Sequence, residues 1–130
     1  MEGFTGSVKQ VLKASKQGRI GGILGTVAQN IGVEAKYALA VETALGGAMQ
    51  NIIVENEDIA KRCIRFLKEM KGGRATFLPL TSITNPQEFK NPEALKEPGV
   101  IGMADEIVEI EDRYRNVAKA MLGRIVVVDN

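Results

Sequence analysis

The stretch GILGTVAQNIGVEAKYALAVETALGG (residues 22–47) returns in altered form as GVIGMADEIVEIEDRYRNVAKAMLG (residues 99–123). An offset of 77 residues aligns identical residues at six positions, and several positions between them match in character. The identical pairs are Gly22/Gly99, Gly25/Gly102, Glu34/Glu111, Tyr37/Tyr114, Leu45/Leu122 and Gly46/Gly123. After a three-residue gap the match resumes, with NIIVEN (51–56) on IVVVDN (125–130). Two copies predict a pseudo-symmetric pair, because a solenoid requires about three or more repeats.

Each copy predicts the same local structure, namely an apolar start, a helix, a glycine stop and a buried strand. The first helix is expected from about Glu34 to Leu45, and Gly46 and Gly123 suit the left-handed position that ends a helix. The β-branched runs after the glycines are short and apolar enough to be buried strands. Equivalent apolar stripes run along the two helices: Tyr37, Ala40, Val41, Ala44 and Leu45, then Tyr114, Val117, Ala118, Met121 and Leu122.

The remaining segments predict two further helices and a strand. Residues 7–14 have helical spacing of apolar side chains, and residues 57–71 form a second amphipathic pattern that Gly72 and Gly73 are expected to end. Residues 74–78 are expected to be extended, and the proline-rich residues 81–98 to connect two subdomains. The expected buried face of the second helix comprises Ile59, Ala60, Cys63, Ile64, Leu67 and Met70. The fold class is therefore predicted as α/β (α+β), with two pseudo-repeated subdomains, each a small sheet with packed helices.

Composition narrows the chemistry. The 130 residues include one cysteine and no histidine, so neither a metal centre nor a cofactor is expected, and the usual general base near neutral pH is absent. Cys63 has apolar helical neighbours and is interpreted as a buried, unreactive thiol. Tyr37 and Tyr114 could pair with Lys36 and Arg113 in acid–base chemistry, but their stripe positions favour core tyrosines. No apolar run predicts a membrane span or a signal peptide, so a cytoplasmic location is expected. Because the sequence has no histidine and no convincing pair of nucleophile and base, a non-enzymatic domain is expected.

The charge is unevenly distributed. Residues 1–80 carry eleven Lys/Arg and seven Asp/Glu, and residues 81–130 carry six and nine, which gives +4 and −3. One basic face stands out within the first part: Lys61, Arg62, Arg65, Lys68, Lys71 and Arg74. This face is consistent either with a solvated helix surface or with contacts to a phosphate backbone. The face is interpreted as having no aromatic residue among its charges, so base stacking is not expected.

A glycine-rich stretch offers a different reading. GRIGGILG (residues 18–25) is the segment of this sequence that could cradle a phosphate, as in a small-ligand or nucleotide-binding regulatory domain. It matches neither the dinucleotide-binding pattern nor the P-loop pattern. Turns and close backbone packing are therefore the favoured explanation for these glycines.

The central sequence ETALGGAMQNIIVENEDIAKRCIRFLKEMKGGRATFLPL (residues 42–80) resembles the hinge domain of structural maintenance of chromosomes (SMC) proteins. The part most typical of that family is GRATFLPL (residues 73–80). GFTGSVKQVLKA is similar to the family's first hinge helix, and MLGRIVVVDN to the helix-to-strand step of its second subdomain.

The resemblance implies a hinge domain over residues 1–130. Subdomain I would be residues 1–80, the connection 81–98, and the start of a C-terminally shortened subdomain II residues 99–130. Such hinges join two chains at the tip of coiled-coil arms, in ATPases that condense and segregate chromosomes, and contact DNA through basic surface. The expected partners are thus a second copy and DNA, and the expected location is the nucleoid. The strand at Ile125, Val126, Val127 and Val128 is the expected dimer edge, and dimerisation of the shortened domain is expected to be weak.

Overall fold

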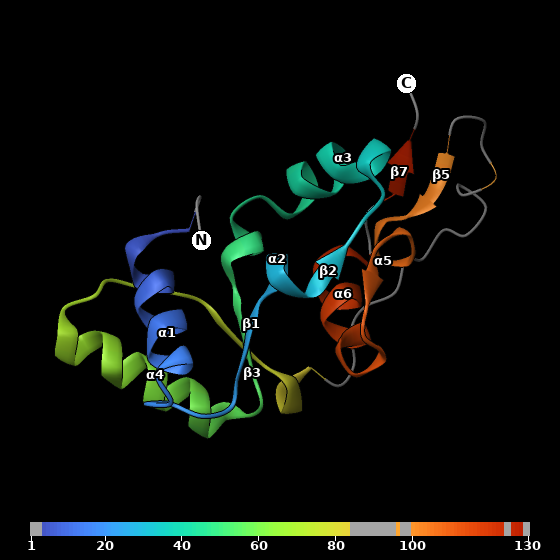
Figure 1. The fold of residues 1–130 in the computed structure, drawn as a ribbon. Helices are drawn as coiled ribbons and strands as arrows, with labels where there is room; N and C mark the ends of the chain where they lie inside the picture. Colours follow the sequence, from blue (N-terminus) through green and yellow to red (C-terminus); the bar gives the residue numbers. More distant parts are fainter. Residues whose placement is uncertain (1–3, 84–95, 97–99, 124–125, 129–130) are drawn as a thin grey trace. The chain divides into compact units, whose positions relative to one another are not determined.

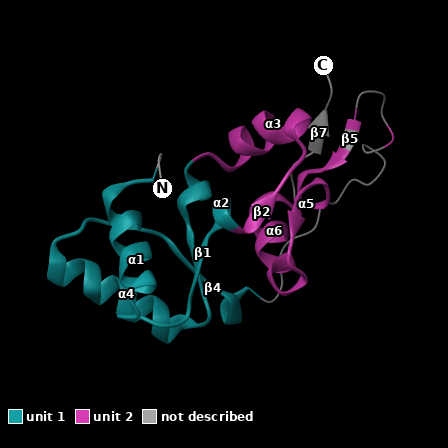
Figure 2. Ribbon diagram, viewed as in Figure 1, with its two compact units in different colours: residues 1–29, 47–83 teal, residues 30–46, 84–130 magenta. Residues whose placement is uncertain are grey.

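The computed structural model describes residues 4–83, 96, 100–123 and 126–128 (Figure 1). The chain forms two compact units, the first made of residues 1–29 and 47–83, the second of residues 30–46 and 84–130 (Figure 2). Residues 30–46 belong to the first sequence repeat but pack in unit 2, so the units interleave along the chain. The expected division of the chain into residues 1–80, 81–98 and 99–130 remains an expectation.

Unit 1 is built around a three-stranded sheet. Its elements are α1 (Gly6–Lys16), β1 (Ile23–Thr26), α2 (Val27–Asn30, which leads toward unit 2), η1 (Gly46–Gln50), β3 (Ile52–Val54), α4 (Glu57–Met70), β4 (Phe77–Pro79) and η2 (Leu80–Ser82). The strand order is β1-β3-β4, with β3 antiparallel to β1 and parallel to β4. Helix α4 supplies the crossover that a parallel pair requires. The predicted helices near 7–14 and 57–71 are confirmed, and the strand expected at 74–78 lies at 77–79.

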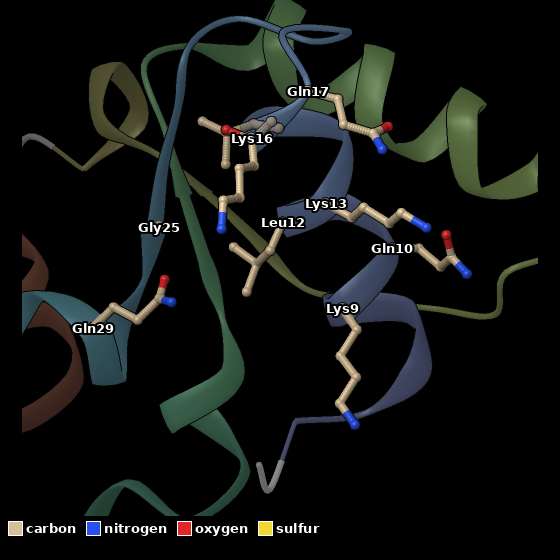
Figure 3. A pocket seen from close by; sticks show the side chains of 10 residues that line it. Lys9, Gln10, Leu12, Lys13, Lys16, Gln17, Gly25 and Gln29 are labelled. Carbon is tan, nitrogen blue, oxygen red and sulfur yellow. The ribbon is translucent and has the colours of Figure 1, made fainter. Parts of the chain in front are cut away.

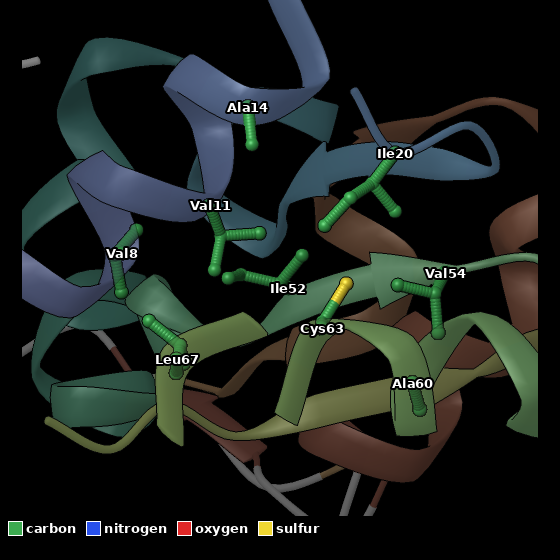
Figure 4. Packing of buried hydrophobic residues seen from close by; sticks show 9 residues of the cluster. All are labelled: Val8, Val11, Ala14, Ile20, Ile52, Val54, Ala60, Cys63 and Leu67. Atoms are coloured by element: carbon green, nitrogen blue, oxygen red, sulfur yellow. The ribbon is translucent and has the colours of Figure 1, made fainter. Parts of the chain in front are cut away.

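The core of unit 1 lies between the sheet and the two helices α1 and α4 (Figure 4). All three residues of β3 are fully buried, and Ile52 and Val54 point from one face of this strand toward the helices. The buried cluster consists of Val8, Val11, Ala14, Ile20, Ile52, Val54, Ala60, Cys63 and Leu67. This packing fixes the orientation of α4 and therefore decides which of its residues reach solvent.

The buried face expected for α4 was too wide. Ala60, Cys63 and Leu67 are buried, but the side chains of Ile64 and Met70 are each 45% exposed. The fully buried stripe is narrow, at positions i, i+3 and i+7 of the helix, and Ile59 and Phe66 beside it are partly buried against the same cluster. Ile64 and Met70 therefore belong to the surface of α4.

Unit 2 contains the second copy of the repeat together with residues 30–46 of the first. It contains β2 (Ile31–Gly32), α3 (Ala35–Leu45), β5 (Val100–Met103), α5 (Ala104–Ile107), β6 (Glu109–Ile110), η4 (Asp112–Tyr114), α6 (Arg115–Leu122) and β7 (Val126–Val128). Strand β5 pairs antiparallel with β7, and β2 with β6. No helix in the described part of the chain is long and apolar enough to span a bilayer.

The strand registers confirm the repeat. In the first copy Thr26 lies opposite Ile52, and in the second Met103 lies opposite Val126. Both ladders have a register shift at the same place, between Ile23 and Gly25 and between the corresponding positions 100 and 102. The order of strand, short helix, short strand, helix and strand is also the same in the two copies. The predicted fold class is confirmed.

The two glycine stops differ in conformation. Gly46 has φ 53 and ψ −128, so its positive φ suits glycine. Gly123 has φ −67 and ψ −6, so the left-handed conformation expected there is wrong. Its backbone N–H donates to the carbonyl of Lys119 at 2.8 Å, and a Cβ at Gly123 would collide with that carbonyl group. Close packing thus accounts for this glycine.

Candidate functional site

Helix α4 presents the strongest charged stripe of unit 1. Asn56 caps its start by accepting a hydrogen bond from the Ile59 N–H at 3.0 Å, and Glu57 and Asp58 lie in the first turn. The buried stripe of α4 faces the core, so the opposite stripe, Lys61, Arg65 and Lys68, is exposed. Arg62, Lys71 and Arg74 are exposed as well. The structure therefore places all six residues of the expected basic face in solvent.

The charge of this face is not neutralised locally. None of its six side chains forms an ion pair with a carboxylate of residues 4–83, 96, 100–123 or 126–128. Unit 1 carries ten Lys/Arg against five Asp/Glu, and unit 2 carries seven against eleven. Unit 1 is thus +5 and unit 2 is −4. The electrostatic potential of unit 1 favours an anionic partner.

Hydrogen bonds fix the backbone at Lys71 and Arg74, the two cations that follow α4. Lys71 adopts a left-handed conformation, with φ 51 and ψ 40. Its backbone N–H donates to the carbonyl oxygens of Leu67 and Lys68 near the end of the helix. The expectation that Gly72 and Gly73 end the helix is wrong by one residue, because Lys71 itself takes the capping position. Ser7 then donates from its hydroxyl to the carbonyl of Arg74 at 2.5 Å, which ties this segment to α1.

A second basic stripe, not anticipated from the sequence, runs along α1. Lys9, Lys13 and Lys16 recur at i, i+4 and i+7, opposite the buried Val8, Val11 and Ala14. They line a hollow of about 720 Å³ beside β1 (Figure 3). The floor of the hollow includes Leu12, Ile23 and Gly25, and Gln29 adds a polar group. The signal that could have revealed this stripe is its helical spacing.

A second hollow, of about 600 Å³, lies where α4 approaches the turn after α1. Arg62 and Arg65 come from α4, and Arg19 and Ile20 come from the turn. Phe66, Glu69 and Met70 complete its lining. An aromatic ring therefore does lie among the basic residues, and the interpretation that none does was wrong.

The glycine-rich stretch GRIGGILG forms the turn after α1 and the start of β1. Gly22 has φ 82, and a Cβ there would lie 2.8 Å from Cγ1 of Ile59, so close packing against α4 requires glycine. The helix that follows this stretch, α2, has only four residues. The geometry supports the reading of turns and close backbone packing for these glycines.

The two tyrosines lie in matching charged surroundings in unit 2. The Nζ of Lys36 lies 5.0 Å from the Tyr37 ring centroid, and the Cζ of Arg113 lies 4.5 Å from that of Tyr114. The same cations pair with Glu34 at 3.6 Å and Glu111 at 3.2 Å. The pKa of Lys36 is raised, first by the Tyr37 hydroxyl and then by Glu34. Both tyrosines were expected in the core. Tyr114 is buried, as expected, whereas Tyr37 is only half-buried.

Cys63 is fully buried in the core of unit 1. Burial raises the pKa of its thiol to about 11, because the thiolate is poorly solvated there. Such a thiol is a weak nucleophile near neutral pH. Among the residues whose placement is described, no group of three or more His, Cys, Asp or Glu side chains converges as a metal site would.

The expected dimer edge lies partly outside the described residues. Val126, Val127 and Val128 form β7, which pairs with β5, and Ile125 is not described. The corresponding strand of unit 1, β3, pairs on both of its edges, with β1 and with β4. Within the described part of the chain β7 pairs with β5 alone. Its role as an interface remains a prediction.

These features define an internally repeated α/β domain with a basic unit and an acidic unit. The chain belongs to the SMC hinge family, because the family model for the flexible hinge domain of SMC proteins matches residues 20–130.

Sequence relatives agree with that assignment. The chain is 44% identical over 128 residues to the chromosome partition protein Smc of Halothermothrix orenii, and 38% identical over 130 residues to that of Bacillus subtilis. In each case the match covers 98% of the chain and 11% of the relative. The chain therefore spans about a tenth of the length of these relatives.

Solved structures extend the agreement to the fold. The fold is similar to that of the Geobacillus stearothermophilus SMC hinge domain, solved as an asymmetric dimer, with a TM-score of 0.91 at 40% identity. The match covers 98% of this chain and 51% of the Geobacillus chain. The fold is also similar to that of the Pyrococcus furiosus Smc hinge domain with an extended coiled coil, with a TM-score of 0.74 at 35% identity. The match covers 91% of this chain and 40% of the Pyrococcus chain.

Proposed function

We propose that this chain is the dimerisation hinge of a chromosome-organising SMC ATPase and that it contacts DNA through the basic surface of unit 1. The ATP-hydrolysing heads would lie elsewhere in the parent protein, at the far ends of coiled-coil arms. The parent would act in chromosome condensation and segregation at the nucleoid. Family membership and the dimeric Geobacillus hinge support the assembly role.

The observation that carries DNA contact is the uncompensated basic stripe of α4. Lys61, Arg65 and Lys68 lie on one exposed stripe of the helix, and Lys71 and Arg74 are exposed just after its end. Cations with free donors contact phosphates without reading bases. Binding through this surface should therefore be independent of sequence and should weaken steeply as salt rises.

The experiment replaces Lys61, Arg65 and Lys68 together by glutamine and follows duplex affinity by fluorescence anisotropy over a salt series. Each lost phosphate contact should reduce the slope of log affinity against log salt by about 0.9. A matched control replaces Lys36, Arg113 and Lys119 by glutamine, which removes the same charge from unit 2 and leaves α4 unchanged. Equal effects of the two triple variants would show that net charge alone governs binding, and would reject the α4 surface.

Dimerisation is proposed to pair unit 1 of one copy with unit 2 of the other. The opposite charges of the units, +5 and −4, favour that pairing over like with like. The strand at Ile125–Val128 is the proposed edge. Val127→Lys, a change within β7, should weaken dimers in sedimentation equilibrium, since a charge on a strand edge opposes pairing. Dimers of unchanged strength would place the interface elsewhere.

A further inference from the structure

The hollow between α4 and the turn after α1 combines an aromatic floor with three guanidinium groups. On α4, Arg62, Arg65, Phe66, Glu69 and Met70 fall at i, i+3, i+4, i+7 and i+8, so they share one face of the helix. The turn contributes Arg19 and Ile20 from the opposite side. The volume of about 600 Å³ is within the range of small-molecule sites.

The hollow continues as a groove toward α1. A smaller hollow of about 220 Å³ shares Arg19, Phe66 and Met70 with the first and adds Lys13 and Gln17 from α1. Helices α1 and α4 lie side by side in unit 1, so this groove is bounded by both (Figure 1). Phe66 packs against the buried cluster yet is only half-buried, which leaves part of its ring facing the groove.

This combination has a definite chemical preference. An aromatic ring beside a thioether offers a surface on which a flat aromatic ligand can stack. Three arginines against the single carboxylate of Glu69 give the hollow a net positive charge that favours an anionic group. Guanidinium forks are well matched to phosphate oxygens. The ligand class that has both a flat aromatic ring and a phosphate is a nucleotide.

We propose that this hollow binds an unpaired nucleotide, with the base against Phe66 and Met70 and the phosphate held by Arg19, Arg62 and Arg65. The inference rests on the proposed DNA contact and makes it more specific. Bases in a duplex are stacked on each other, so only a single strand or a free nucleotide offers a base to this site. The exposed α4 stripe, by contrast, contacts a backbone of either kind.

The other basic hollow lacks the stacking element. The floor beside Lys9, Lys13 and Lys16 is formed by Leu12, Ile23 and Gly25, none of them aromatic. The shallow hollow of about 220 Å³ on the α4 stripe is lined by Lys61, Ile64, Arg65 and Lys68, again without a ring. Preference for unpaired bases should therefore depend on Phe66 specifically.

The test measures affinity for an oligo-dT strand and for a duplex of the same length by fluorescence anisotropy. Phe66→Leu keeps an apolar side chain in the core and should lower single-strand affinity by about fivefold or more, with duplex affinity within about twofold of the wild type. Glu69→Gln should raise single-strand affinity. Leu39→Ala, an exposed apolar change on α3 of unit 2, is the control and should leave the ratio of the two affinities unchanged.

The outcomes separate this inference from the proposed DNA contact. Tight duplex and single-strand binding with a ratio unaffected by Phe66→Leu would overturn the nucleotide site and leave the DNA surface intact. If the wild type bound neither oligonucleotide, the DNA surface would fail, and titration with thymidine monophosphate followed by NMR would decide the site. Shifts of the Phe66 ring signals with the nucleotide but not with deoxyribose 5-phosphate would support it as a free-nucleotide site. No such difference would overturn it.

Discussion

Gly32 lies opposite Glu109 in the ladder between β2 and β6. Glu109 is also the residue that corresponds to Gly32 in the 77-residue repeat. The adjacent pair, Ile31 and Ile110, maps under the same repeat onto positions 108 and 33, the next positions in that register. The two copies thus meet through a self-complementary contact of the kind found in two-fold dimers. A contact that joins equivalent strands explains why residues 30–46 pack in unit 2.

The Gly32 position offers a direct test of this contact. A Cβ at Gly32 would lie 3.4 Å from Oε2 and 3.5 Å from Cβ of Glu109, which is ordinary van der Waals contact. Gly32→Lys should be more stable than Gly32→Glu by about 0.4–2 kcal/mol, since opposite charges across a strand pair stabilise it and like charges destabilise it. Urea unfolding measures the difference. In a Glu109→Lys background the order should reverse, and an unchanged order would mean that the pair does not form.

The two repeat tyrosines should differ in their contribution to stability. Tyr114 is 2% exposed, whereas Tyr37 is half-buried. Tyr114→Ala should cost about 3–5 kcal/mol, the range for removing a large buried ring. Tyr37→Ala should cost less than half as much, because less of its ring leaves water on folding. Equal losses in chemical denaturation would contradict the difference in burial.

Lys71 is the one non-glycine residue with positive φ in the described part of the chain. A left-handed conformation costs an L-residue about 1–2 kcal/mol, and glycine has an entropic cost of about 0.5–1 kcal/mol. Lys71→Gly should therefore leave stability unchanged or raise it by up to about 1.5 kcal/mol. Lys68→Gly, inside the last turn of α4, should lower it by about 0.5–1 kcal/mol. Thermal unfolding of both variants tests the cap, and destabilisation by Lys71→Gly would exclude it.

Cys63 predicts a stability loss at alkaline pH. The pKa of its thiol is about 11 in the folded protein and 9.0 as the reference value. Below pH 9 the thiol is protonated in both states, so its full contribution is present; from pH 9 to about 11 the unfolded state loses the proton first, and stability falls. Cys63→Ala should lack this component. The stability difference between wild type and variant should shrink as pH rises, and a constant difference would show that the thiol is not shielded.

Local patterns sufficed for much of the fold. The β-branched runs and helical stripes of the two copies located β3, α3, α6 and β7, because burial and helical spacing are visible in short stretches of sequence. Helix α4 was also predicted, but the exposure of Ile64 and Met70 was not. The width of a buried stripe depends on the partner surface, which the helix's own sequence does not contain.

The site was less accessible to sequence reasoning. The six cations of the α4 surface were identified correctly as exposed charges, since a basic stripe opposite an apolar one is a local signal. The hollow around Phe66 was missed because Arg19 reaches it from a turn more than forty residues earlier. Likewise, the placement of residues 30–46 in unit 2 depends on two-residue strands, β2 and β6, which are too short to give a periodic pattern.

The lysines of α1 provide a final test of how far the DNA surface extends. Lys9, Lys13 and Lys16 are all exposed, but Lys13 alone among them also lines the groove shared with α4. If duplex phosphates follow α4, Lys13 is the lysine of α1 expected to join them, because it shares a hollow with α4 residues. Replacing all three by glutamine should then reduce the salt slope by about 0.9, the value for one contact, and Lys13→Gln alone should reproduce that loss. A reduction of about 2.7 for the triple variant would mean that DNA runs along α1 instead.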